Sequence, residues 1–307
     1  MRIPCSIYRG GTSKPVFFLE EDLPADRDVA VLRAFGSPDP RQIDGIGGGD
    51  PLTSKVAYVK KSGRPDADVD YTYGYVGIDE ATIDYKGNCG NTSAAVPLFA
   101  RAKGLVEGNV VRIFNTNTEK IIVATVAEDG LSVSLDFIDS QGATTGKLLP
   151  TGEVRDVVRL TGVGEVEVAM VDAVNPFVFV RERSLDLQAL DELRRIAGER
   201  MGIGYSPGYP KASIVWPSER YDLEAKATAL DRWHKAYAVS GAVCTAVAAK
   251  IPGTVVHEVA RASGTRVTIG HPSGSIAVEV VLEGGVVKRA AVERTARLLM
   301  EGEVIIP

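Results

Sequence analysis

The stretch Asn88-Cys89-Gly90-Asn91-Thr92-Ser93-Ala94-Ala95 places a cysteine at the predicted start of a helix. It follows a strand-like segment at 71–85 and leads into 96–104, where Pro97 suits a first helical turn and Gly104 a C-terminal stop. Backbone N–H groups at a helix start bind anions and favour a thiolate over a thiol. The pattern indicates a reactive cysteine beside a carboxylate site, and a buried structural cysteine is the alternative for this motif taken alone.

A second window of the same kind, SGAVCTA at 240–246, opens another predicted helix that ends near Lys250. The flanking segments also pair in order, because 9–18 and 171–180 precede the two windows and 111–118 and 265–274 follow them. Each flanking segment is a predicted strand that runs into a polar turn. The chain is therefore predicted to contain two copies of one unit of about 150 residues, an ordinary domain length.

The predicted domains are residues 1–150 and 151–307, with the boundary at the Pro/Gly turn near 149–152. Strands are predicted at 123–137 and 276–287, around turns that contain Gly130 and Gly284. Helices are predicted at 187–201 and 228–239 from their apolar periodicity, and a Gly/Pro-rich loop is predicted at 202–217.

Composition excludes several classes of function for these 307 residues. The formal net charge is −5 with no Lys or Arg cluster, which argues against nucleic acid as a partner. No apolar run reaches the ~18 residues of a membrane helix, and no signal-peptide pattern opens the chain. Three cysteines argue against a disulfide framework and indicate a cytoplasmic location, and three scattered histidines give no metal-ligand spacing, so no metal is expected.

A glycine-rich element at 42–59 brings three glycines, at 47–49, just before Lys55 and a predicted strand. Such glycines let the backbone approach a ligand closely. The element is not a phosphate-binding loop, because the Gly-x-x-x-x-Gly-Lys-Ser/Thr order is absent and no helix follows. Lys55 is then either a surface lysine on a strand edge or an amine directed into a pocket, and spacing alone favours the surface.

Five motifs occur together and in order: RGGTSK at 9–14, QIDGIGG at 42–48, LTSKVA at 52–57, GNCGN at 87–91 and HPSG at 271–274. In this combination the chain resembles the family of 2-methylaconitate isomerase and 4-oxalomesaconate tautomerase, within the diaminopimelate epimerase-like superfamily. The resemblance implies an α/β (α+β) fold of two similar domains, each a mixed sheet wrapped around a central helix, with the active site in the cleft between them.

The resemblance also implies an isomerase that needs no cofactor and moves a C=C bond by 1,3-allylic proton transfer. Its substrate would be an unsaturated di- or tricarboxylate of the methylaconitate, oxalomesaconate or itaconate type. Lys55 would be the principal acid/base, with Cys89 assisting, and backbone N–H groups would stabilise the dienolate. A homodimer is left open. The implied substrate-binding residues are Arg9, Thr12, Ser13, Gly48, Ser54, Gly90, Asn91, Ser240, Gly241, His271 and Ser273.

One departure from the superfamily pattern affects the chemistry. Racemases and epimerases of this fold use one cysteine in each half, but here Ser240 takes the second place and Cys244 lies one helical turn further on, where it is expected to pack in the core. A serine hydroxyl transfers protons poorly at neutral pH, which disfavours stereoinversion by two thiols. Two alternatives stay open, a racemase or epimerase of an amino or hydroxy acid and a non-catalytic carboxylate-binding protein.

Overall fold

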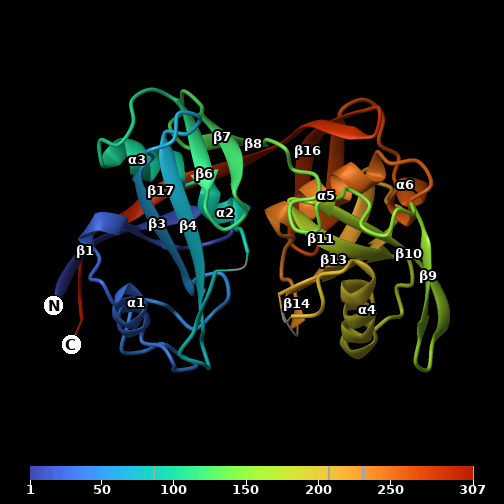
Figure 1. The fold of residues 1–307 in the computed structure, drawn as a ribbon, viewed down its shortest axis with the longest axis horizontal. Coiled ribbons are helices and arrows are strands. Elements are labelled where there is room, and N and C mark those ends of the chain that lie inside the picture. Colours follow the sequence, from blue (N-terminus) through green and yellow to red (C-terminus); the bar gives the residue numbers. More distant parts are fainter. Residues whose placement is uncertain (86, 207, 230–231, 307) are drawn as a thin grey trace. The chain divides into compact units, whose positions relative to one another are not determined.

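The computed structural model describes residues 1–85, 87–206, 208–229 and 232–306. The chain divides into two compact units, which are described separately: unit 1 is Met1–Asp136 with Glu293–Pro307, and unit 2 is Phe137–Val292 (Figure 1). The sequence had placed the boundary near 149–152 and the whole C-terminal half in one domain. The C-terminal segment lies in unit 1 because β17 (Val286–Ile305) is 20 residues long and its second half pairs with β1 (Arg2–Gly10).

Unit 1 is a mixed sheet with short helices. Strand pairing is antiparallel for β1–β2, parallel for β2–β3, antiparallel for β3–β4, parallel for β4–β6 and antiparallel for β6–β7. Besides β1 and the end of β17, its elements are β2 (Val16–Leu19), the 3-10 helix η1 (Glu20–Asp22), α1 (Arg27–Phe35), β3 (Lys55–Lys61), β4 (Val69–Val76), β5 (Ile83–Asp84), α2 (Gly90–Ser93), α3 (Val96–Ala102), β6 (Val110–Asn115), β7 (Lys120–Val126) and β8 (Ser132–Phe137).

Unit 2 repeats this arrangement. Pairing is antiparallel for β10–β11, parallel for β11–β12, antiparallel for β12–β13, parallel for β13–β15 and antiparallel for β15–β16. Its elements are β9 (Asp156–Leu160), β10 (Gly164–Ala173), β11 (Asn175–Val180), α4 (Leu187–Arg200), β12 (Lys211–Trp216), β13 (Leu223–Ala229), β14 (Arg232–Trp233), α5 (Val239–Ala249), α6 (Val255–Val259), β15 (Arg266–His271), β16 (Gly274–Glu283) and the start of β17.

The two units therefore share one order of strand senses, and their helices occur at matching points. A helix follows the second strand of each repeat (α1 and α4), and helices follow the fourth strand (α2 with α3, and α5). This equivalence confirms the duplication that the two small-residue windows predicted.

Each repeat packs its sheet against the helix that follows the fourth strand. In unit 1, Phe99 of α3 packs its ring on Phe17 of β2, with ring centroids 5.1 Å apart, and on Tyr8 of β1. In unit 2, every residue of α5 is buried, and a Cβ on Gly241 would lie 2.9 Å from the ring of Phe177. An apolar helix of small residues can be enclosed by strands on several sides, because the backbones approach closely.

Most local predictions hold, and two are wrong. α4 is confirmed, capped by Asp186, and so are the strands around the Gly130 and Gly284 turns. The helix predicted at 228–239 is wrong for the residues that the structure describes before Val239, and residues 230–231 lie outside the described residues. Thr228 belongs to β13, Arg232 opens β14, and a helix begins only at Val239. The prediction of a loop at 202–217 is also wrong in its second half, which forms strand β12. Pairing of β12 and β13 with their neighbours overrides the local helix and loop preferences.

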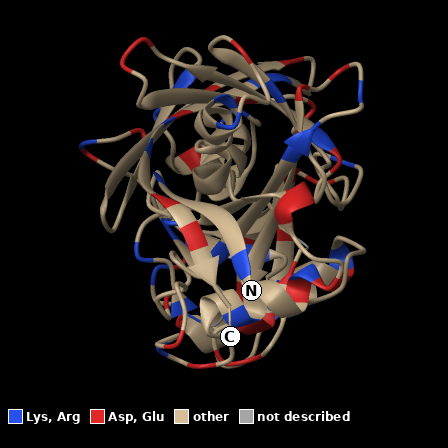
Figure 2. Cartoon of the chain, turned by 90° about the vertical axis from the view of Figure 1, so that its left-hand side faces the viewer, with Lys and Arg blue, Asp and Glu red and all other residues tan. Residues whose placement is uncertain are grey.

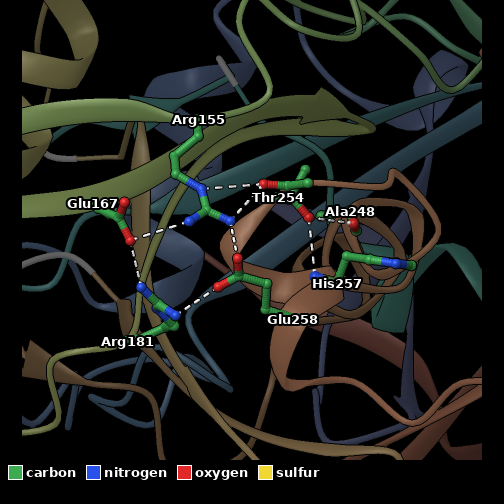
Figure 3. A network of polar contacts seen from close by, with 8 residues as sticks. Arg155, Glu167, Arg181, Ala248, Thr254, His257 and Glu258 are labelled. Atoms are coloured by element: carbon green, nitrogen blue, oxygen red, sulfur yellow. Dashed lines mark hydrogen bonds and ion pairs between the residues drawn. The ribbon is translucent and has the colours of Figure 1, made fainter.

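A closed ring of ion pairs joins four segments of unit 2 (Figure 3). Glu167 lies 3.2 Å from Arg155 and 2.5 Å from Arg181, and Glu258 of α6 pairs with the same two arginines. Arg155 also donates to the carbonyl of Gly253 at 2.9 Å. Each charge in the ring has two opposite partners, so the ring fixes α6 against the ends of β10 and β11.

Charges of both signs are mixed along the chain rather than separated (Figure 2). The N-terminal amine donates to the carbonyl of Ile306 at 2.7 Å, which places the two chain ends side by side. Within the described ranges, no helix is long and apolar enough to cross a membrane.

Candidate functional site

Cys89 is the residue that precedes helix α2, as the sequence predicted. Its backbone is extended, with φ −122° and ψ 98°, and its carbonyl accepts the helical hydrogen bond from the Ser93 amide at 2.9 Å. The predicted helix is divided into α2 and α3, with Pro97 in the first turn of α3 and Gly104 at φ +69° after its end.

Two glycines bring the end of β1 against α2. A Cβ on Gly10 would lie 2.1 Å from the carbonyl oxygen of Asn91, and Gly11 has φ +51°, a conformation that favours glycine. Only backbone without a side chain fits between β1 and α2 at this point. The motifs at 9–14 and 87–91 are thus joined by direct backbone contact.

Three side chains from separate elements meet beside α2. The Lys55 Nζ atom donates to the Ser13 Oγ atom at 2.9 Å and lies 3.3 Å from the Cys89 Sγ atom. The Ser13 Oγ and Cys89 Sγ atoms are 3.8 Å apart. Lys55 is only 8% exposed, so the interpretation of this residue as a surface lysine is wrong. The amine points inward because Lys55 opens β3, whose next residues are in the core of unit 1.

The surroundings of Cys89 favour its thiolate. Burial alone raises the pKa of the thiol, but the Lys55 ammonium and hydrogen bonds from Thr92 and Ser13 lower it further than burial raises it, to about 7. Near neutral pH a large share of Cys89 is therefore present as the thiolate. Burial, with the charge at Cys89, holds the pKa of Tyr71 well above its usual value, so this neighbouring phenol stays neutral.

The glycine-rich loop is held by Gln42, a residue that the sequence analysis had not singled out. The Gln42 side chain accepts from the Gly49 amide at 2.9 Å and donates to the Ser54 hydroxyl at 2.7 Å. That hydroxyl donates in turn to the Val76 carbonyl at 2.8 Å, so both functions of the predicted substrate-binding Ser54 are used within the protein. Only the position of Gln42 at the head of its motif hinted at this role.

The other predicted site residues of unit 1 differ in how many hydrogen bonds they form within the protein. The Arg9 guanidinium donates to the carbonyl of Thr295 at 2.9 Å, to its hydroxyl at 2.8 Å and to the Gly11 carbonyl at 3.2 Å. The Asn91 amide donates to the Thr12 hydroxyl at 2.9 Å. Gly48 has φ +92° in the loop that Gln42 holds, and Gly90 is the first residue of α2.

The predicted residues of unit 2 lie in two places. Ser240 is buried in the first turn of α5, next to Gly241. At the turn after β15, the His271 ring accepts from the Ser273 amide at 3.2 Å, and the Ser273 hydroxyl donates to the Lys235 carbonyl.

Cys244 packs in the core of unit 2, as predicted. It is fully buried and its thiol donates to the carbonyl of Val171 at 3.4 Å. Burial raises the pKa of this thiol far above its usual value, so it is protonated and inaccessible.

Over the part of the chain that the structure describes, no three His, Cys, Asp or Glu side chains are grouped to hold a metal ion.

A family model described as PrpF protein matches residues 1–307. The chain belongs to this family. It is 40% identical to the 3-methylitaconate isomerase of Eubacterium barkeri, over 100% of this chain and 97% of the relative. It is 40% identical to the 4-oxalomesaconate tautomerase of Pseudomonas putida (99% and 96% covered) and 34% identical to the 2-methyl-aconitate isomerase of Cupriavidus necator (100% and 98% covered).

Solved structures confirm the fold class. A methylitaconate-delta-isomerase superposes with a TM-score of 0.84 at 40% identity, covering 99% of this chain and 95% of that one. A hydroxyproline epimerase from Agrobacterium vitis has a TM-score of 0.63 at 13% identity, covering 99% and 92%, which shows a shared fold. The diaminopimelate epimerase-like architecture expected from the sequence is therefore correct.

Proposed function

We propose that this chain is a cofactor-independent isomerase that moves a C=C bond within an unsaturated di- or tricarboxylate. Relatives that align with nearly the whole chain are named as isomerases or tautomerases of methylitaconate, oxalomesaconate and methylaconitate. The observation that carries the proposal is the contact of the Lys55 amine with the Cys89 thiol, 3.3 Å apart in a largely buried site.

The reaction is a 1,3-allylic proton shift. A base removes a proton from the carbon next to the double bond, and the electron pair spreads over the allyl system onto a conjugated carboxylate. An acid then returns a proton to the far carbon of the former double bond. One proton is lost and one is gained, so substrate and product are isomers and no redox partner takes part.

We assign Lys55 as the principal acid/base and Cys89 as its assistant. Two groups in contact can share one proton, which lies either on the Lys55 amine or on the Cys89 thiol. Such a pair supplies both a base and an acid to the two ends of an allyl system. Ser13 contacts both groups, which helps to fix their relative positions.

The proposed carboxylate contacts nearest to this site in the sequence are Thr12, Ser13, Gly90 and Asn91. Thr12 and Asn91 bond to each other next to Ser13 and Cys89. The remaining contacts expected from the family motifs stay predictions for the substrate-bound enzyme, and they are Arg9, Gly48, Ser54, Ser240, Gly241, His271 and Ser273.

Stereoinversion by two thiols is the less favoured chemistry. It needs a second exposed or activated cysteine, and Cys244 is fully buried with its thiol bonded to a backbone carbonyl. An enzyme with Lys55 and Cys89 as its proton carriers tolerates Cys244→Ala, whereas a two-thiol racemase loses its activity with either cysteine.

The test is incubation of the purified protein with a panel of aconitate-, itaconate- and oxalomesaconate-type acids in deuterated water, followed by NMR. We expect deuterium at the allylic carbon together with a shifted double bond for at least one acid. Absence of both signals across the panel, with tight carboxylate binding, would instead indicate a non-catalytic binding protein. Deuterium exchange at a saturated stereocentre would indicate a racemase.

A further inference from the structure

Arg294 lies in β17, outside every motif that the sequence analysis singled out, yet it reaches the residues beside Cys89. A Cβ built on Gly11 would lie 3.2 Å from the Arg294 Cδ atom and 2.1 Å from the Asn91 Oδ1 atom. The Arg294 side chain and the Asn91 amide therefore both pack against the backbone of Gly11. The Gly11 amide donates to the carbonyl of Thr295 at 2.8 Å, which fixes this approach.

The Arg294 guanidinium has no counter-charge among the described residues. Its Nη1 atom donates to the carbonyl of Glu293 at 3.2 Å, and its Nε atom is buried without a hydrogen-bond partner. Burial lowers the pKa of Arg294 to about 10, with no neighbouring carboxylate to offset the effect. Buried charges in proteins are normally paired, because an unpaired one carries the full cost of desolvation.

Two other arginines of the chain have their guanidinium groups hydrogen-bonded within the protein. Buried Arg194 donates to the carbonyls of Pro210 and Ser206 and pairs with Asp191. One nitrogen of Arg9 donates to the Gly11 carbonyl and to both oxygens of Thr295, the residue next to Arg294. Arg9 therefore holds the backbone that carries Arg294.

The Asn91 amide supplies a second unsatisfied group at the same place. Its Nδ2 atom donates to Thr12, while its Oδ1 atom is buried with no partner. A hydroxyl both donates and accepts, so the amide can turn over and keep its bond to Thr12. In that orientation the amide NH₂ group lies on the side of Gly11, where the Arg294 side chain also packs, and both groups are donors that suit a carboxylate.

We propose that Arg294 is a substrate-binding residue that receives a carboxylate group of the di- or tricarboxylate, with the Asn91 amide as the second donor. This inference rests on the proposed function, because it names the group that holds an anionic end of the same substrate. A guanidinium binds a carboxylate through two parallel hydrogen bonds, which fixes orientation as well as charge. The carboxylate so held positions the allylic carbons toward Lys55 and Cys89.

The test compares Arg294→Ala and Arg294→Lys with Arg297→Ala, a matched control because Arg297 is an exposed arginine on the same strand. With the acid that the wild-type enzyme isomerises, Arg294→Ala is expected to raise KM about 10- to 100-fold, the range of a hydrogen-bonded charge. We expect the lysine variant to be intermediate and Arg297→Ala to match the wild type. Thermal unfolding of each variant checks that the fold is retained.

A binding readout separates this inference from the proposed function. Tricarballylate, a saturated tricarboxylate with no double bond to move, is titrated calorimetrically into each protein. Weaker binding by Arg294→Ala alone supports the inference even if the wild type isomerises no acid in the panel. Equal KM and equal binding in the Arg294 variants and the wild type overturn it, while leaving a measured isomerase activity intact. A wild type that does not bind tricarballylate and isomerises nothing overturns both.

Discussion

The Lys55 amine and the Cys89 thiol lie 3.3 Å apart although one opens strand β3 and the other precedes helix α2. Both also contact the Ser13 hydroxyl, which comes from the turn between β1 and β2. The Lys55 ammonium lowers the pKa of Cys89, so a change at Lys55 alters the proton affinity of the thiol.

Replacement of Lys55 by methionine is expected to lower kcat of the isomerisation about 10²- to 10⁴-fold, the usual contribution of a positioned acid/base. Methionine keeps the length and apolar stem but cannot carry a proton. The matched control is Lys60→Met on the same strand, because the Lys60 amine is about half exposed and pairs with Glu20. Initial rates measured by NMR should separate the two variants, and equal rates would remove Lys55 from the mechanism.

Cys89 should be alkylated by iodoacetamide with an apparent pKa of about 7, below the usual value for a thiol. The thiolate is the reactive form, so the rate is expected to fall as the pH drops through 7. Cys5 and Cys244 should stay unmodified in the native protein, since both are buried and burial raises the pKa of each thiol. Peptide mass spectrometry identifies the modified residue.

The same alkylation profile in Lys55→Met should shift to higher pH, because the ammonium that stabilises the thiolate is gone. An unchanged profile would mean that the amine does not set the proton affinity of Cys89.

Gly10→Ala is expected to reduce the free energy of unfolding by about 2–3 kcal/mol, the upper part of the usual cost of overpacking. The added methyl group would lie 2.1 Å from the Asn91 carbonyl, so β1 and α2 must separate. Gly63→Ala is the control, because a Cβ there meets nothing within 4 Å. Urea unfolding should show a change within about 0.5 kcal/mol for the control, and equal effects of the two substitutions would contradict the close approach.

Glu258→Gln should destabilise unit 2 by about 1 kcal/mol, because it leaves two arginines of the ion-pair ring facing a neutral group. The effect should shrink in 1 M salt, which screens partly exposed charges. Glu279→Gln is the control, since Glu279 pairs with Arg289 at 3.1 Å and both side chains are about half exposed. Equal shifts in the thermal midpoint for both variants would show that the ring is no stronger than a single pair.

Much of the fold could be predicted because it is encoded locally. The repeated windows at 88–95 and 240–246, the glycine turns and the periodicity of α4 each depend on neighbours close in the chain. The failures have a common cause. The Gly/Pro content of 202–217 hid the strand residues Ile214, Val215 and Trp216, and pairing with neighbouring strands decided that 211–216 and 223–229 are strands.

The site divides in the same way. The sequence alone determined that Cys89 precedes a helix, that Cys244 is a core residue, and that the chain is a duplicated unit of known family. Only the tertiary structure decided that Lys55 is buried against Cys89, that the Ser54 hydroxyl accepts from Gln42, and that Arg294 and Asn91 both pack against Gly11. The physical reason is that helix starts and turns are set by adjacent residues, whereas the partners of a side chain depend on long-range pairing of β1 with β17 and of β2 with β3.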